Sequence, residues 1–256
     1  MPSSPTPMPR NGRLVNCWVL LALIAIASSG CRWTSMGQNT LGVRLYQQGR
    51  YTEALQQFQT AQKSDPSNPD TFYNLGATYH KLGVAQKDNQ LIGQAESLYN
   101  QCLDLQPNHV DCHRGLAVLL AESGRPDRAM ALLKNWATNN PQMADPRIEL
   151  SRLNQEFGQG KLAEQYLDEA LALNPNDYRA WSARGQMREA SGNLDDQRQA
   201  LQNYQQSLAI NSLQPELYQR VAALNVKIAQ NSMSTVGQPV GGWTVQNPKP
   251  NGAPRY

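Results

Sequence analysis

Two cysteines and two histidines lie within the short segment CLDLQPNHVDCH, which runs from Cys102 to His113. Cys and His are the side chains that zinc prefers in structural sites, where four of them complete a tetrahedral shell. Cys112 and His113 are sequence neighbours, however, and adjacent residues on a helix project about 100° apart. The spacing therefore disfavours a four-ligand metal site, and we expect neither a metal nor another cofactor.

The rest of the sequence shows no catalytic constellation. The histidines His80, His109 and His113 have no accompanying G-x-S-x-G, H-E-x-x-H or phosphate-binding loop. The formal net charge is +3, and Arg10 and Arg13 in the first thirty residues supply two of these charges. Without a dense Lys/Arg run, the remaining charge gives no electrostatic basis for nucleic-acid binding. We therefore expect a non-enzyme with no nucleic-acid partner.

The first thirty residues predict an export signal. They begin with a basic stretch, continue with an unbroken apolar run from Cys17 to Ala27, and end in small residues. An apolar run of this length is too short to cross a bilayer core of about 30 Å comfortably. We therefore expect the chain to leave the cytoplasm.

The end of this signal, ASSGC, resembles the lipobox of bacterial lipoproteins. The two small residues before Cys31 match that pattern, and Ser28 departs from it. The resemblance implies that Cys31 carries acyl chains such as palmitate and anchors a periplasm-facing protein in the cell envelope. Arg32 is not the aspartate that retains enteric lipoproteins at the inner membrane, which favours the outer membrane. The alternative is cleavage after Ala27, which would release a soluble secreted protein.

A repeated pattern organises the remainder of the chain. Prolines that end apolar helical patterns recur at Pro66, Pro107, Pro141 and Pro175, and the last two intervals are both 34 residues. A fixed period of this size is typical of repeat proteins built from helix pairs. Before each proline, small and bulky residues recur at matching distances, for example Ala54, Phe58 and Ala61 before Pro66, and Ala95, Tyr99 and Cys102 before Pro107.

The segment FYNLGATY, which includes Phe72 and Tyr79, is similar to the opening motif of the tetratricopeptide repeat, W-x₂-L-G-x₂-Y. The chain as a whole resembles that family, with five copies and a final amphipathic helix. The resemblance implies an all-α fold, a right-handed α-solenoid of antiparallel helix pairs closed by a C-terminal capping helix. Glycines are expected to end the first helix of each pair in a left-handed conformation: Gly49, Gly83, Gly124, Gly158 and Gly192.

The predicted organisation has four parts. A lipoprotein-type signal peptide covers 1–30, an anchor and short linker cover 31–34, and the solenoid covers 35–230. A Gly/Pro-rich tail over 231–256 is expected to be disordered. Within the solenoid, the repeats cover about 35–68, 69–109, 110–143, 144–177 and 178–214, and the capping helix covers 215–230.

The repeat register assigns the ends of the Cys102–His113 segment to packing positions. Cys102 takes the position that Ala61 and Ala170 fill in other repeats, and His113 takes the aromatic position held by Trp181 in the fifth repeat. Cys102 and Cys112 lie a few residues from the same turn, so a disulfide between them is one interpretation in an oxidising compartment. Two separate small buried residues are the other.

The resemblance also implies a binding groove. In tetratricopeptide repeat proteins the first helix of each pair lines a concave face that binds a partner. Asn74 fits the family's clamp for C-terminal carboxylates, but Val43, Asp111 and Gly115 do not match it, which disfavours chaperone tails as ligands. The groove residues carried over to this chain are Asn39, Tyr46, Tyr73, Asn74, His80, Arg114, Glu122, Ile148, Arg152 and Gln186.

Together these observations predict a non-catalytic protein-protein interaction scaffold at the bacterial cell envelope. It would bind a peptide or partner protein through the groove, and its architecture resembles lipoproteins that help assemble envelope machines such as a pilus or secretin. The alternative is an adaptor or sensor module for an envelope enzyme, binding a metal through the Cys102–His113 cluster.

Overall fold

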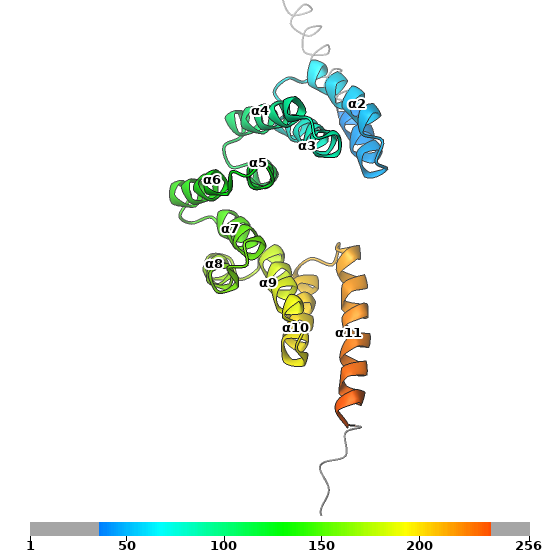
Figure 1. The fold of residues 1–256 in the computed structure, drawn as a ribbon, viewed down its shortest axis with the longest axis vertical. Coiled ribbons are helices and arrows are strands. Elements are labelled where there is room, and N and C mark those ends of the chain that lie inside the picture. The colour runs from blue at the N-terminus through cyan, green and yellow to red at the C-terminus, as the bar shows by residue number, and fades with distance from the viewer. Residues whose placement is uncertain (1–35, 237–256) are drawn as a thin grey trace, which may run out of the picture. The chain divides into compact units, whose positions relative to one another are not determined.

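The computed structural model describes residues 36–236, and within that range every regular element is a helix (Figure 1). The predicted signal peptide, Cys31 and residues 237–256 of the predicted tail lie outside the described residues. The chain divides into two compact units, Met1–Leu153 and Asn154–Tyr256, and the division falls near the end of one helix. The two units are described in turn.

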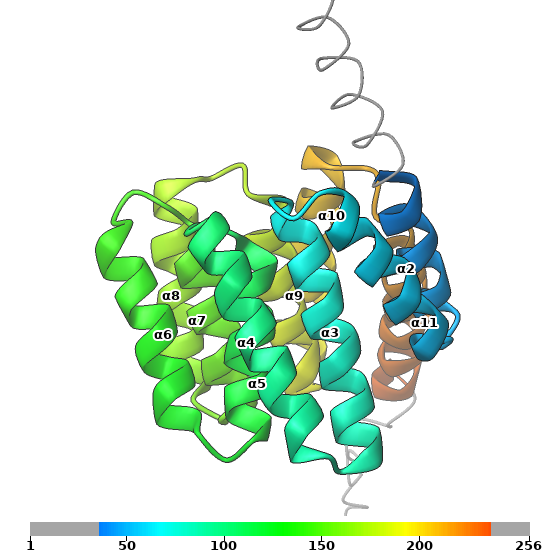
Figure 2. The same cartoon turned by 90° about the horizontal axis from the view of Figure 1, so that it is seen from above.

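The first unit consists of consecutive helices that pack against their neighbours in the chain, such as α3 against α4 and α5 against α6 (Figure 2). Each predicted repeat range from 35 to 143 contains two helices separated by a short turn. The first pair is a helix over 36–47 and α2 (Tyr51–Ser64), followed by α3 (Pro69–Gln86), α4 (Asn89–Leu105), α5 (Val110–Glu122), α6 (Pro126–Asn139) and α7 (Asp145–Glu156), which crosses into the second unit.

The second unit continues with α8 (Gly160–Leu173), α9 (Tyr178–Ser191), α10 (Leu194–Ile210) and α11 (Pro215–Val236). The capping helix α11 is longer than the sequence predicts, because residues 231–236 are helical rather than part of a disordered tail. These six residues contain neither glycine nor proline, and the first helix-breaking residue is Gly237. The helix therefore has no local signal to end at Gln230.

Side chains cap the starts of α3 and α4. Asn68 accepts a hydrogen bond from the backbone N–H of Asp70 at 3.0 Å, and Asp88 accepts one from Gln90 at 2.8 Å. Each cap satisfies a backbone donor that the first turn of a helix leaves without an internal partner. The second repeat range, 69–109, is seven residues longer than the 34-residue period, and Asp88 within the extra residues caps the start of α4.

Four of the five predicted glycine turns have the expected left-handed backbone, with φ between 72° and 80°. Gly83 does not, so that prediction is wrong. The seven extra residues let α3 continue past Gly83 to Gln86, and Lys87 takes the left-handed position with φ 54°. Gly83 instead marks a close approach, because a Cβ placed there would lie 2.7 Å from the Ile92 side chain.

Bulky rings packed against glycines hold neighbouring helices together. A Cβ on Gly115 of α5 would lie 2.7 Å from the ring of Tyr99 on α4, and one on Gly76 of α3 would lie 3.0 Å from it. Tyr99 itself is 2% exposed. Overpacking of this kind costs about 1–3 kcal/mol, so these glycines fix how closely α3, α4 and α5 approach.

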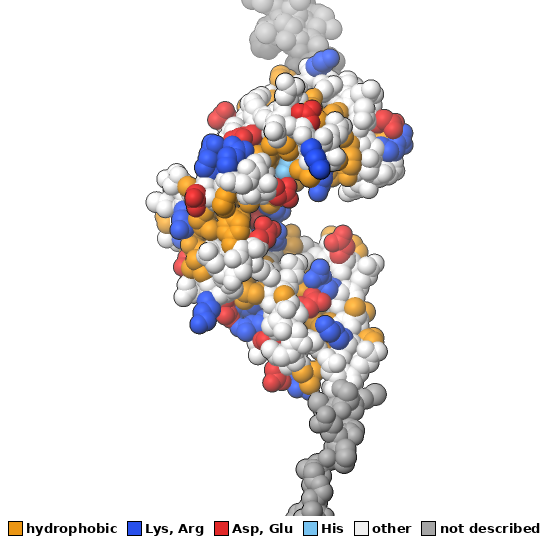
Figure 3. Space-filling view, viewed as in Figure 1, with side chains coloured by type: hydrophobic (Ala, Val, Ile, Leu, Met, Phe, Trp, Pro, Cys, Tyr) orange, Lys and Arg blue, Asp and Glu red, His pale blue; other side chains and the backbone are white. Residues whose placement is uncertain are grey.

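The described helices belong to a protein with an all-α fold of tandem helix pairs. No helix within residues 36–236 combines the length and apolar character needed to span a membrane. On the face drawn in Figure 3, acidic and basic side chains are interspersed.

Candidate functional site

The first helices of the N-terminal repeats carry a face of aromatic and amide side chains, which we call the first-helix face and define by Asn39, Tyr46, Tyr73 and Asn74. All four are half-buried, so each keeps part of its surface for a ligand. The Asn74 amide donates a hydrogen bond to Asn39 Oδ1 at 3.0 Å, and the two residues lie 35 positions apart in successive repeats. This bond fixes the orientation of both amides on neighbouring helices.

The two tyrosines of this face sit in a partly desolvated environment. Burial raises the pKa of the Tyr46 phenol, and the nearby Tyr51 and Tyr73 raise it further. Burial also raises the pKa of Tyr73, and the Asp111 carboxylate adds to the effect. Both phenols therefore stay protonated at neutral pH, and their hydroxyl groups retain a proton to donate.

Arg114 on α5 is held by two carboxylates. Its guanidinium donates to Glu149 at 2.9 Å and 2.5 Å and to Asp111 at 2.9 Å. Burial alone would lower the pKa of Arg114, but the hydrogen bonds to Glu149 and the two negative charges outweigh burial and raise it. Glu149 is 3% exposed, so breaking this pair would leave a buried charge unpaired. The Arg114 guanidinium is therefore already paired with carboxylates of the protein and is a poor candidate for binding a ligand carboxylate.

His80 pairs with Glu122 of the next repeat, with 3.0 Å between His80 Nε2 and the Glu122 carboxylate. The His80 side chain is 11% exposed, whereas that of Glu122 is 55% exposed. Burial lowers the pKa of His80 and the charge of Lys81 lowers it further, while Glu122 acts in the opposite direction. Glu122 thus offers an accessible carboxylate, and His80 contributes mainly as its buried partner.

The other predicted groove residues lie in different settings. Ile148 is 1% exposed, so it packs in the interior and cannot contact a ligand; its neighbour Glu149 instead reaches Arg114. Arg152 is half-buried on α7. Gln186 is exposed on α9 in the second unit, where it borders a pocket of about 310 Å³ lined also by Ser182, Gln214, Pro215, Glu216, Leu217 and Arg220.

Glu149 was not predicted from the sequence as part of this face. It belongs to α7, one repeat beyond Arg114, and a carboxylate 35 residues after an arginine matches the repeat spacing. That spacing is the signal that pairs the two residues, but it does not reveal that the carboxylate is buried.

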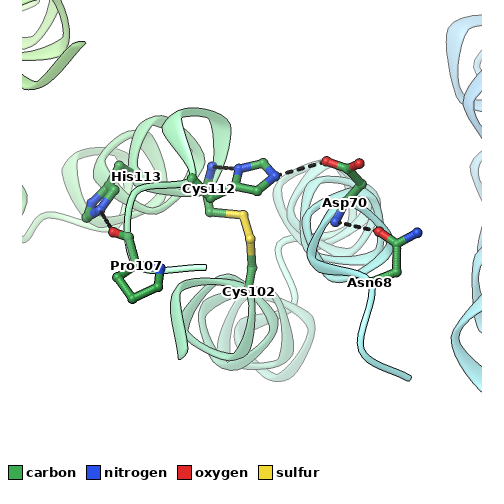
Figure 4. Close-up of a disulfide and its surroundings, with 7 residues drawn as sticks. Asn68, Asp70, Cys102, Pro107, Cys112 and His113 are labelled. Carbon is green, nitrogen blue, oxygen red and sulfur yellow. Dashed lines mark hydrogen bonds and ion pairs between the residues drawn. A yellow bond between two sulfur atoms is a disulfide. The ribbon is translucent and has the colours of Figure 1, made fainter. Parts of the chain in front are cut away.

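A disulfide between Cys102 of α4 and Cys112 of α5 spans the turn between these helices (Figure 4). The two Cα atoms are 6.4 Å apart, and both side chains are fully buried. Of the two interpretations of these cysteines, the structure has the bridged one. The bond joins the second helix of one repeat to the first helix of the next.

His109 lies beside this bond and caps α5. Its Nδ1 accepts the backbone N–H of Cys112 at 3.2 Å, and its Nε2 lies 3.0 Å from Asp70 Oδ1 at the start of α3 (Figure 4). Because Nδ1 accepts, the ring proton resides on Nε2 and is donated to the carboxylate. Asp70 therefore fixes both the tautomer and the orientation of His109.

His113 faces away from the sulfur atoms. Its Nε2 donates to the Pro107 carbonyl at 2.9 Å, and its ring stacks on Trp136 with 3.9 Å between centroids. Burial lowers the pKa of His113, and the hydrogen bond to Pro107 offsets part of this effect. The structure thus brings Cys102, His109 and Cys112 together but excludes His113 from the cluster.

Comparisons with known proteins point to one repeat family. A family model described as TPR repeat matches residues 42–83, and a model described as tetratricopeptide repeat matches residues 88–153 and 120–187. These matches include Tyr46, Tyr73 and Asn74 of the first-helix face and both cysteines of the disulfide.

Among curated proteins, the chain is 25% identical over 159 residues to protein O-mannosyl-transferase TMTC1 of Homo sapiens, which covers 59% of this chain and 17% of that protein. It is 30% identical over 117 residues to cellulose synthase operon protein C of Pseudomonas fluorescens (strain SBW25), and this match covers 46% of this chain and 8% of that protein. The chain spans less than a fifth of the length of either relative.

Among solved structures, a thermophilic TPR protein from Thermus thermophilus has a TM-score of 0.55 and 27% sequence identity to the chain. The match covers 75% of this chain and 99% of the other. The arrangement of helices is therefore similar over nearly the whole of that protein.

Proposed function

The chain belongs to the tetratricopeptide repeat family, and on this premise we propose that it is a non-catalytic scaffold that binds a peptide or partner protein at the bacterial cell envelope. Proteins of this fold generally serve as modules that bind peptides or other proteins. The function is argued from the first-helix face, because a shared fold alone does not identify a function.

The observation that carries the proposal is the composition and exposure of that face. Tyr46 and Tyr73 present amphipathic rings that give contact area at a low cost in side-chain entropy, as in many protein interfaces. The oriented amides of Asn39 and Asn74 offer donors and acceptors for a peptide backbone. The engagement of Arg114 by Glu149 and Asp111 argues against a carboxylate clamp, so the ligand is an internal peptide segment or a folded surface.

Site-specific photo-crosslinking tests this proposal in the native envelope. A photoreactive phenylalanine analogue at Tyr46 or at Tyr73 is expected to give the same crosslinked partner, because both positions lie on one face. The matched control is the same analogue at Gln101, an exposed residue on α4. Equal crosslinking of that partner from Gln101, or no specific product from either tyrosine, would reject the first-helix face as the binding surface.

The proposed envelope location rests on the sequence of the first 32 residues. We place the protein in the outer membrane through acylated Cys31, because the signal ends in small residues followed by a cysteine and Arg32 follows that cysteine. Labelling with a palmitate analogue is expected in the wild type and not in Cys31→Ala. A Cys31→Ala protein that still labels, or a mature wild-type chain beginning at Ser28, would reject the anchor.

The proposed process is assembly of an envelope machine such as a pilus or a secretin. Its support is the combination of a lipoprotein-like signal with tandem interaction repeats. Mass spectrometry of the partner crosslinked from Tyr73 tests this step separately. A secretin or pilus component supports it, and a partner outside such machines rejects it while leaving the scaffold function intact.

A further inference from the structure

The cluster of Cys102, His109 and Cys112 has the composition of a metal site. The two sulfur atoms and one ring nitrogen of His109 all lie within 4.8 Å of one another. Both cysteines are fully buried and His109 is 7% exposed. The disulfide occupies the sulfur atoms in the oxidised chain, so any metal chemistry belongs to the dithiol form.

His109 is already oriented as metal-binding histidines usually are. Metal-ligating imidazoles commonly donate their second N–H to a carboxylate, which fixes the tautomer and increases ligand basicity. Here Asp70 accepts from Nε2 at 3.0 Å, which leaves the Nδ1 lone pair directed at the backbone N–H of Cys112. The hydrogen bond that Nδ1 now receives from Cys112 is long at 3.2 Å and is the one contact a cation there would displace.

Opening the bond creates space of the right size. Sulfur atoms joined in a disulfide are about 2.0 Å apart. Two thiolates on one zinc ion, each at about 2.3 Å, are about 3.8 Å apart in tetrahedral geometry. The Cα atoms of Cys102 and Cys112 are 6.4 Å apart. Rotation of the two side chains can therefore increase the distance between the sulfur atoms to this value while α4 and α5 keep their positions.

Charge selects the cation. Two thiolates and a neutral imidazole balance the charge of one divalent ion, which matters because the cluster is buried and an unbalanced charge there is costly. Thiolate ligands favour zinc over hard cations such as Mg²⁺ or Ca²⁺.

We propose that the dithiol form of the chain binds one Zn²⁺ through Cys102 Sγ, Cys112 Sγ and His109 Nδ1, so that this turn is closed by a disulfide or by a metal. A dithiol donor opens the bond by exchange: each cysteine sulfur gains one electron and one proton, and the donor becomes a disulfide. Binding of Zn²⁺ then releases the two thiol protons. Asp70 is a positioning residue, since it acts through His109.

Metal titration of the full-length mature chain tests the proposal. The chain is reduced with a dithiol, freed of reductant without air, and titrated with Zn²⁺ and with Co²⁺ as a spectroscopic probe. The reduced wild type is expected to bind one ion and to give thiolate-to-cobalt charge-transfer bands, while the oxidised chain gives none. No binding by the reduced chain, or equal binding by both forms, would overturn the proposal.

Variants separate the ligands from their surroundings. His109→Ala is expected to weaken binding at least tenfold and to change the cobalt spectrum, and Asp70→Asn to weaken it about 10–100-fold, as for other second partners of metal-bound histidines. His113→Phe is the matched control, because that ring faces away from the sulfurs and Phe72 fills the equivalent position of the previous repeat. A reduced His109→Ala chain with wild-type affinity, or a His113→Phe chain without binding, would reject the ligand set.

A Cys102 variant is expected to fold because other repeats have alanine at the equivalent position. The position of Cys102 is occupied by fully buried alanines elsewhere, Ala61 and Ala170, so Cys102→Ala is compatible with the packing. This variant is expected to keep the helical circular-dichroism signal and to lose metal binding. Retention of stoichiometric binding without Cys102 would contradict the proposal.

Discussion

Two equivalent turns of the molecule share their closing contacts and differ at one pair of buried positions. The α4–α5 turn of the first unit and the α8–α9 turn of the second are related by two 34-residue repeats, so Pro107 corresponds to Pro175 and His113 to Trp181. In both, a ring N–H of the aromatic position donates to the proline carbonyl, at 2.9 Å from His113 and 2.8 Å from Trp181. The same local contact therefore closes both turns.

The capping contacts are equivalent as well. His109 caps α5 through Nδ1, and Asp177 caps α9 by accepting the backbone N–H of Arg179 at 2.9 Å. The difference is the pair of buried positions on either side of the turn. They hold the bonded Cys102 and Cys112 in the first unit and the alanines at 170 and 180 in the second, all fully buried.

The comparison shows that the disulfide does not create the turn. Caps, the proline and the ring-to-carbonyl hydrogen bond form the same structure in the second unit without it. The bond instead restricts the unfolded chain, because it links residues ten positions apart. The chain-entropy account predicts about 3 kcal/mol of stabilisation for a loop of this size.

The largest expected effect comes from making the first turn like the second. The double variant Cys102→Ala, Cys112→Ala is expected to lose about 3 kcal/mol of unfolding free energy while keeping its helix content. Urea denaturation followed by circular dichroism measures the loss, and hydrogen exchange locates it in α4 and α5. A double variant that unfolds at the wild-type urea midpoint would show that the bond contributes no stability.

The sequence predicted the common part of these turns better than their difference. The proline period and the aromatic position predicted where the helices end and placed His113 as a packing residue, because both follow from the repeat. The role of His109 did not follow, since its orientation depends on Asp70, which lies 39 residues away. The state of the cysteines stayed open because spacing alone does not give the direction of their Cβ atoms.

The converse change makes the second turn like the first. Ala170→Cys with Ala180→Cys is expected to form a disulfide and to stabilise the chain by about 1–2 kcal/mol, less than the native bond because engineered bonds retain some strain. Thiol counting under denaturing conditions detects the bond, and urea denaturation before and after reduction measures its effect. Free thiols at both positions in the oxidised protein would show that the two turns are less alike than their hydrogen bonds indicate.

The shared ring-to-carbonyl hydrogen bond can be tested by replacing each donor ring with phenylalanine. Trp181→Phe removes the Nε1 donor that reaches the Pro175 carbonyl but keeps an aromatic side chain. We expect a loss of about 1 kcal/mol, the usual net contribution of one hydrogen bond. The matched change His113→Phe is expected to cost less in urea denaturation, because the disulfide continues to hold its turn. A larger loss at His113 would contradict this interpretation.

For the groove, too, the repeat pattern predicts the helix face on which a residue lies but not how deeply it is buried. Repeat spacing assigned Asn39 and Asn74 to one face without predicting the hydrogen bond between them, and it assigned Ile148 to the same face although that residue is buried. Helical periodicity gives the side of a helix on which a residue lies; it does not give how deeply neighbouring side chains cover it. Burial at Ile148 and Glu149 depends on packing that one sequence position does not reveal.

The smallest expected effect is a loss of stability of the first unit at acidic pH that depends on His80. His80 in α3 and Glu189 in α9 both stand eleven positions after the start of their helices, and the residue at this position in α3 is a histidine, whose reference pKa is about 6.5. Burial lowers the pKa of His80, with Lys81 adding to the shift and Glu122 opposing it. The unfolded chain therefore binds a proton at higher pH than the folded chain, and stability falls as pH drops below about 6.5.

Paired variants isolate this contribution. Urea midpoints at pH 7.5 and 5.5 are expected to differ less in His80→Gln than in the wild type, since the variant lacks the group that titrates. Glu122→Gln is expected to widen the difference, because it removes the carboxylate that favours the protonated imidazole 3.0 Å away. An unchanged pH dependence in His80→Gln would mean that the acid response of the first unit arises elsewhere, and that the repeat position shared with Glu189 does not distinguish the units in this way.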